Sequence, residues 1–118
     1  MATIMVVDDA AFMRLRCSQL LTENGYRVIE ASNGAEAIAK YKEFKPDGVL
    51  LDITMPDMDG LTALKELMAL DNNARVSMVT AMGQQSIVIE ALKLGAKDFV
   101  VKPFDPERVL AAVKKMLS

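Results

Sequence analysis

The sequence predicts an α/β fold in which a parallel sheet lies between two layers of helices. Short apolar runs rich in Val and Ile alternate with helical patterns from one end of the chain to the other. Such alternation is typical of βαβ units, and right-handed crossovers then place helices on both faces of the sheet. The chain has 118 residues, 52% of them apolar and 25% charged. We therefore expect one domain over residues 1–118 that buries its own core.

The predicted strands are short runs of four or five residues, or three in the last case, which is too short for helices. They are Thr3–Val7, Arg27–Ala31, Gly48–Leu51, Arg75–Val79 and Phe99–Val101.

The first two predicted helices have recognisable ends. The first, Ala11–Asn24, stops before Gly25, where a left-handed residue would terminate it. The second opens at Asn33, with Glu36 three residues later as in a capping box, and runs to Phe44.

The later helices follow the third, fourth and fifth strands. Gln85–Leu94 stops before Gly95, again a left-handed cap. In the last helix Asp105 can cap and Pro106 suits the first helical position. The apolar residues of that helix recur at i, i+3, i+4 and i+7, namely Val109, Ala112, Val113 and Met116.

The composition excludes several function classes. With no His, the chain cannot carry Ser/His or Cys/His nucleophile pairs, His-ligated zinc or phosphohistidine. The single Cys17 forbids an intrachain disulfide and is expected to be inert. A net charge of −2 gives no general attraction to nucleic acid, and no apolar run approaches the ~20 residues of a membrane span. We expect a cytoplasmic protein, because Met1 does not begin a signal-type segment.

Charged residues stand where three apolar runs stop. Asp8 and Asp9 close the first, Asp52 closes the third and Lys102 closes the last. Parallel strands end at the same edge of the sheet, so these residues and Thr80 should gather there. Taken singly, an Asp after a strand is more often a turn former or a helix cap, as Asp9 could be for the helix that follows it.

Three converging carboxylates need compensation. Like charges ~4 Å apart repel by about 4 kcal/mol at an effective dielectric constant of 20. Lys102 supplies one positive charge, and an oxygen-only ligand set suits Mg²⁺, which binds one or two carboxylates together with phosphoryl oxygens. The pattern therefore indicates phosphoryl chemistry.

Four segments resemble the response regulator receiver domain family over nearly the whole chain. They are Asp8-Asp9, VLLDITMPDMDG, VTA and VVKPF. The resemblance implies a flavodoxin-like (βα)5 three-layer sandwich with strand order 2-1-3-4-5. Within the family, VDDAAFMR, TAMGQQ and AKDFVVKPF are similar to the single-domain regulators of chemotaxis.

The resemblance assigns roles at the phosphorylation site. Asp52 matches the phosphoacceptor, whose carboxylate takes a phosphoryl group from phosphohistidine. Asp8 and Asp9 match the acidic pair that holds Mg²⁺, together with Asp52 and the backbone carbonyl of Thr54. Lys102 matches the cation that pairs with a phosphoryl oxygen.

The same resemblance assigns a switch. Thr80 matches the hydroxyl that turns toward the phosphoryl group, and Phe99 matches an aromatic residue that swings inward with it. Phe99 lacks a hydroxyl, so its part would be steric only. The family makes the bond between Lys102 and Pro103 cis, which aims the lysine into the site.

The same resemblance implies that two positions, Thr54 and Met82, flank the path of attacking water. Neither side chain is a good base, and the Met82 thioether could cover the acyl phosphate. We expect slow self-dephosphorylation and a dedicated phosphatase.

The predicted function is a phosphorylation-activated switch that catalyses only its own phosphoryl uptake and loss. The expected partners are a sensor histidine kinase and, in chemotaxis, the flagellar motor switch, with no direct contact to nucleic acid or membrane. Because no output domain follows residue 118, we expect the protein to act by protein contact alone. We also expect a monomer.

Alternatives remain within the family and outside it. The chain could be a phosphorelay receiver or a receiver excised from a longer regulator. A flavodoxin-like FMN carrier would need a Ser/Thr/Gly-rich loop where the chain has DDAAFMR, and an aspartate-nucleophile phosphatase would need Asp at position 54, which is Thr.

Overall fold

The computed structural model describes residues 1–55, 58–81, 84–103 and 105–118. In these residues five strands alternate with five helices. They are β1 (Thr3–Val7), α1 (Ala11–Glu23), β2 (Arg27–Ala31), α2 (Gly34–Phe44), β3 (Gly48–Asp52), α3 (Gly60–Leu70), β4 (Val76–Ala81), α4 (Gln85–Lys93), β5 (Asp98–Lys102) and α5 (Pro106–Leu117).

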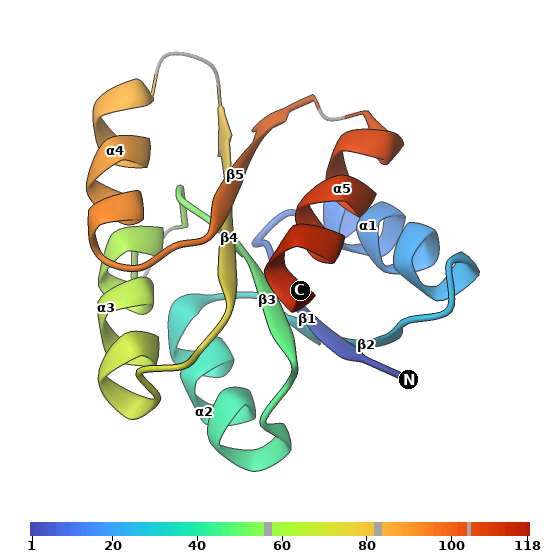
Figure 1. Ribbon diagram of the computed structural model, residues 1–118, viewed down its shortest axis with the longest axis horizontal. Coiled ribbons are helices and arrows are strands. Elements are labelled where there is room, and N and C mark those ends of the chain that lie inside the picture. The colour runs from blue at the N-terminus through green and yellow to red at the C-terminus, as the bar shows by residue number, and fades with distance from the viewer. Residues whose placement is uncertain (56–57, 82–83, 104) are drawn as a thin grey trace.

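The strands form one parallel sheet in the order β2-β1-β3-β4-β5, which confirms the predicted fold (Figure 1). β1 pairs with both β2 and β3, so the chain reverses its direction of travel across the sheet after β2. The crevice at such a reversal, outside the carboxyl ends of the strands, is where open α/β sheets bind ligands.

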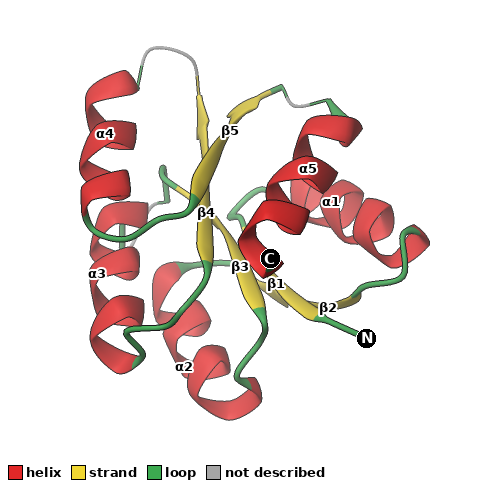
Figure 2. Cartoon of the chain, in the orientation of Figure 1, coloured by secondary structure: helices red, strands yellow, loops and turns green. Residues whose placement is uncertain are grey.

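Helices cover both faces of the sheet (Figure 2). α2, α3 and α4 lie on one face, and α1 and α5 lie on the other (Figure 1). Each face carries its own hydrophobic core. Along β1, Met5 and Val7 pack in the core beneath α2, α3 and α4, whereas Ile4 and Val6 pack in the core beneath α1 and α5. Burial on both faces explains why the strands read as continuous apolar runs. Among the helices of the described chain, none is both long and apolar enough to span a membrane.

The predicted helix caps are present. Gly25 and Gly95 have φ angles of 90° and 117°, the left-handed region that favours glycine. The Asn33 side chain accepts a hydrogen bond from the Glu36 N–H at 2.8 Å. The side chain of Asp105 accepts from the Glu107 N–H at 3.0 Å, and Pro106 is the first residue of α5.

Several predicted boundaries are wrong by one or two residues. β3 includes Asp52, β4 runs to Ala81 and so includes Thr80, and β5 includes Lys102. The reason is that strand pairing depends on backbone groups: Asp52 is paired with Val79 in the ladder after the apolar pattern has stopped. At their other ends β4 begins one residue later and β5 one residue earlier than predicted, and α1 and α4 end one residue sooner.

Candidate functional site

The polar residues at the carboxyl ends of the strands lie along one edge of the sheet. Val7 pairs with Leu51, so Asp8, directly after β1, lies next to Asp52, the last residue of β3. Ala81 pairs with Lys102 at the ends of β4 and β5. The backbone register alone therefore brings these side chains to one place.

Lys102 lies between two buried carboxylates. Its Nζ atom is 3.0 Å from Asp8 Oδ2 and 3.1 Å from Asp52 Oδ2. Asp8 is only 6% exposed and Asp52 only 5%. Buried charges of this kind persist when they are paired and hydrogen-bonded, and the ammonium of Lys102 meets that need for both aspartates.

Asp9 completes an acidic cluster with Asp8 and Asp52. One carboxylate oxygen from each lies within 4.8 Å of the others. Asp9 is exposed, so the cluster opens to solvent on its side. Three carboxylates against one ammonium leave a formal charge of −2, and oxygen ligands at this spacing fit a hard divalent cation. The geometry thus fits the predicted Mg²⁺ site.

Burial and charge act in opposite directions on the protonation of this cluster. Burial raises the pKa of the Asp52 carboxyl, and this effect exceeds the opposing attraction of the Lys102 ammonium. Burial also acts to lower the pKa of Lys102, but the hydrogen bond and charge of Asp8 and the charge of Asp52 raise it above its usual value. Lys102 therefore stays charged. A further cation beside Asp52 would favour the ionised form of the Asp52 carboxylate.

The loop after β1 is held by Asp8 rather than by Asp9. The Ala10 N–H donates to Asp8 Oδ1 at 2.9 Å, and Arg14 Nη1 donates to the Asp8 carbonyl oxygen at 2.6 Å. Ala10 is the N-cap of α1 and has no side-chain cap. The alternative in which Asp9 caps that helix is wrong, because Asp8 supplies the local turn.

The loop after β3 packs closely against the backbone of Asp52. The Thr54 N–H donates to Asp52 Oδ1 at 3.2 Å, and the Gly60 N–H donates to the Ile53 carbonyl oxygen at 2.7 Å. A Cβ atom at Gly60 would collide with the carbonyl oxygen of Asp52 and with Cα of Ile53. A glycine at this position therefore lets α3 begin directly beside the predicted phosphoacceptor.

Thr80 is buried, at 2% exposure, and its hydroxyl has two acceptors nearby. Thr80 Oγ1 lies 2.7 Å from Gln84 Oε1 and 3.1 Å from the Ala81 carbonyl oxygen. The sequence patterns predicted no role for Gln84, which entered the family resemblance only within the segment TAMGQQ. Gln84 follows Thr80 by only four residues in the sequence, and this proximity was the signal that could have pointed to a contact between the two side chains.

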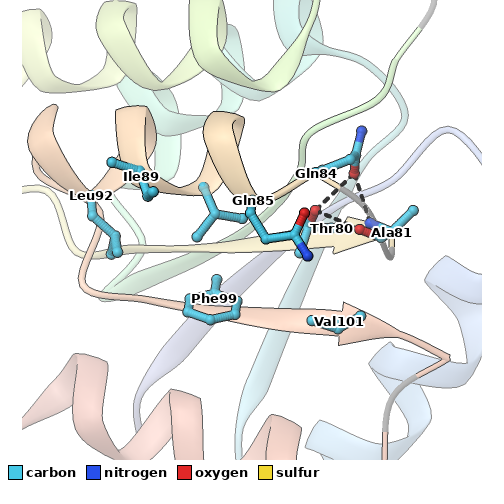
Figure 3. A pocket seen from close by; sticks show the side chains of 9 residues that line it. Thr80, Ala81, Gln84, Gln85, Ile89, Leu92, Phe99 and Val101 are labelled. Atoms are coloured by element: carbon cyan, nitrogen blue, oxygen red, sulfur yellow. Dashed lines mark hydrogen bonds between the residues drawn. The ribbon is translucent and has the colours of Figure 1, made fainter.

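Phe99 is half-buried on β5 and lines a groove shared with Thr80 and α4 (Figure 3). The volume of the groove is ≈ 380 Å³, and Val88, Ile89 and Leu92 of α4 form its apolar wall. The two predicted switch residues, Thr80 and Phe99, therefore face the same space.

Two other predicted features complete the site. The peptide bond between Lys102 and Pro103 is cis, as expected. Thr54 is exposed beside Asp52. Met82, the second residue predicted to control access of water, lies outside the described residues.

A comparison with protein families matches residues 4–114 to the response regulator receiver domain. The chain belongs to this family. In this receiver domain the acidic cluster, Lys102 and the buried Thr80 lie near the carboxyl edge of the sheet; their roles remain predictions.

Curated relatives are similar over nearly their whole length. The chemotaxis protein CheY of Bacillus subtilis (strain 168) is 58% identical over 116 residues, which cover 98% of this chain and 97% of the relative. The chemotaxis protein CheY of Thermotoga maritima is 56% identical over 96% of this chain and 95% of the relative. More distantly, sporulation initiation phosphotransferase F of Bacillus subtilis is 38% identical over 97% of this chain and 92% of the relative.

A solved structure shows the same fold in a complex. The CheX–CheY–BeF3–Mg²⁺ complex from Borrelia burgdorferi contains a chain that matches with a TM-score of 0.94 and 42% identity, over 99% of this chain and 90% of that chain.

Proposed function

We propose that this receiver domain is a phosphorylation-activated response regulator of chemotaxis that accepts a phosphoryl group on Asp52 from a sensor histidine kinase. The observation that carries the proposal is the contact of one ammonium, Lys102, with Asp8 and Asp52 at the carboxyl edge of the sheet. Similarity to proteins named CheY supports chemotaxis as the pathway.

In the proposed transfer, an Asp52 carboxylate oxygen attacks phosphorus and the bond from phosphorus to the donor histidine nitrogen breaks. The product is an acyl phosphate on Asp52. Lys102 already touches Asp52, so its ammonium is placed to pair with an oxygen of the incoming group. Asp8, Asp9, Asp52 and the carbonyl of Thr54 would hold Mg²⁺, which offsets negative charge on the transferring group.

The proposed response is a shift between two conformations. Thr80 would leave its present acceptors and donate to a phosphoryl oxygen, and Phe99 would move into the groove that both residues line. The protein then binds a target, for which we propose the flagellar motor switch. It would act in the cytoplasm as a signalling switch whose only chemistry is its own phosphoryl uptake and loss.

A phosphatase is a further proposed partner. Thr54 offers only a short hydroxyl at the mouth of the site, which positions attacking water poorly, so the acyl phosphate should be lost slowly. The CheX–CheY–BeF3–Mg²⁺ complex from Borrelia burgdorferi supports the proposal that a separate protein binds the receiver. Faster loss of phosphate from a Thr54→Asn variant would agree with this role of position 54, and an unchanged rate would refute it.

A phosphorelay receiver is the second candidate. Sporulation initiation phosphotransferase F, at 38% identity, carries a name that indicates phosphoryl transfer. In that case Asp52 would pass its group to a second histidine rather than drive binding of the motor switch.

Binding to the motor switch distinguishes the two. With Mg²⁺ and beryllofluoride, a mimic of the acyl phosphate, we expect affinity for the flagellar motor switch protein of the same organism to rise between about 5- and 150-fold. Thr80→Ala should lose most of this gain. Equal affinity with and without beryllofluoride, together with transfer to a histidine phosphotransfer protein, would favour the phosphorelay.

A further inference from the structure

The Gln84 side chain makes three hydrogen bonds that connect the end of β4 with Thr54, which follows β3. We call this set of three bonds the Gln84 bridge. Its Oε1 atom accepts from the Thr80 hydroxyl at 2.7 Å and from the Ala81 N–H at 2.7 Å. Its Nε2 atom donates to the Thr54 hydroxyl at 3.2 Å. Figure 3 shows the Gln84 oxygen turned toward Thr80 and Ala81, just beyond the end of β4.

The orientation of the amide follows from the chemistry of its partners. A backbone N–H can only donate, so the atom that faces Ala81 must be the carbonyl oxygen of Gln84. The amide nitrogen then points to Thr54, whose hydroxyl can accept. The three contacts are thus mutually consistent, and rotating the amide by half a turn would break the contact with Ala81.

In the Gln84 bridge, the Thr80 hydroxyl donates its proton to Gln84, and the proposed switch needs that same proton for the phosphoryl group. A threonine hydroxyl has one proton to donate. At Thr80 that proton has two acceptors, Gln84 Oε1 and the Ala81 carbonyl oxygen. The hydroxyl cannot donate to a phosphoryl oxygen on Asp52 while it donates to Gln84, so the bond to Gln84 must break during activation.

The other end of the bridge reaches the loop of the phosphoacceptor. Thr54 accepts from Gln84 through its hydroxyl and donates to Asp52 Oδ1 through its N–H at 3.2 Å. Gln84 therefore connects the loop after β3 with the end of β4 through side-chain bonds. A change in the Thr54 loop on phosphorylation of Asp52 would act directly on the residue that holds Thr80.

We propose that Gln84 is a positioning residue that holds the Thr80 hydroxyl in the conformation without phosphate, and that release of the Gln84 bridge is a step of activation. The inference rests on the proposed function, since it requires that Thr80 respond to a group on Asp52. Loss of the bridge removes a restraint from one state only, so it favours the activated state and everything that binds it.

The test is the affinity for beryllofluoride in saturating Mg²⁺, measured by calorimetry. Gln84→Met keeps a side chain of similar length but removes the amide, so beryllofluoride should bind about fivefold more tightly than to the wild type. Gln19→Met is the matched control, because Gln19 is an exposed residue of α1 and does not line the groove beside Thr80. It should bind beryllofluoride like the wild type, and thermal unfolding would confirm that each variant is folded.

The same substitution in a Thr80→Ala background separates positioning from a general structural effect. Without the threonine hydroxyl, Gln84 keeps its bonds to Ala81 and Thr54 but can no longer restrain Thr80, so Gln84→Met should no longer tighten binding. Wild-type affinity for Gln84→Met, weaker binding, or equal tightening in the Thr80→Ala background would each overturn the inference. Failure of the wild type itself to bind beryllofluoride would overturn the proposed function as well, so the two failures are distinguishable.

Discussion

At the scale of single residues, the site is defined by how its charges are shared. Lys102 contacts Asp8 and Asp52, and these two aspartates are buried. Asp9 lies in the same cluster but is exposed. The charge of Asp9 is therefore the one that Lys102 does not offset by contact, and it remains for a bound cation.

Asp9→Ala should weaken binding of Mg²⁺, because it removes a ligand and a negative charge. We expect a loss of about tenfold in affinity, equivalent to ~1.4 kcal/mol. The same change should leave the metal-free protein equally or more stable, since it relieves repulsion among the carboxylates. Calorimetric titration with Mg²⁺ and urea denaturation measure the two effects.

Glu43→Gln is the control for Asp9→Ala, because Glu43 is an exposed acidic residue of α2. It should titrate with Mg²⁺ like the wild type. Identical titrations for Asp9→Ala and the wild type would show that Asp9 is not a ligand.

At the scale of elements, the beginning of α3 fixes the loop that carries Thr54. Gly60→Ala places a methyl group against backbone atoms of Asp52 and Ile53, which cannot move aside without distorting β3. We expect a loss of about 1–3 kcal/mol in the free energy of unfolding, measured by urea denaturation.

Gly34→Ala is the matched control, since Gly34 is likewise the first residue of a helix. Its new methyl group would meet Sδ, Cγ and Cβ of Met58, of which the thioether end can move aside, whereas at Gly60 all the close atoms belong to backbone. A loss at Gly60 no larger than that at Gly34 would contradict the role assigned to the close approach of α3.

The elements themselves were largely predictable from sequence, and their ends were not. Both faces of the sheet are covered, so apolar runs marked all the strands. Asp52, Thr80 and Lys102 were nevertheless expected beyond or at the ends of those runs, whereas each belongs to its strand. The pattern of apolar residues indicates which side chains are buried. It does not indicate whether the backbone hydrogen bonds of a strand continue through polar residues such as Asp52.

The sequence predicted which residues form the site better than it predicted the hydrogen bonds between them. The sequence indicated that Asp8, Asp9, Asp52, Thr80 and Lys102 would converge, because parallel strands share one edge. It could not indicate that Asp8 rather than Asp9 holds the turn before α1, or that Gln84 holds Thr80. Those facts depend on side-chain orientation in loops, which has no periodic pattern to reveal it.

At the scale of the whole molecule, the site lies at one edge of a sheet that helices cover on both faces (Figure 1). The core beneath α2, α3 and α4 and the core beneath α1 and α5 lie on opposite faces of the sheet (Figure 1). Thr80 and Phe99 lie at the boundary between the sheet and α4, beside an apolar groove. In the proposed switch, a change at Asp52 would therefore reach the surface of the molecule through Thr80 and Phe99.

The central claim is that Asp52 accepts a phosphoryl group, and intact-protein mass measured after incubation with acetyl phosphate and Mg²⁺ tests it most directly. The wild type should gain the mass of one phosphoryl group, and removal of Mg²⁺ should prevent the gain. Asp52→Asn should gain nothing, because an amide is a poor nucleophile, whereas the control Asp47→Asn, at the opposite end of the strands beside Thr3, should react like the wild type. Undiminished phosphorylation of a folded Asp52→Asn variant would contradict the account.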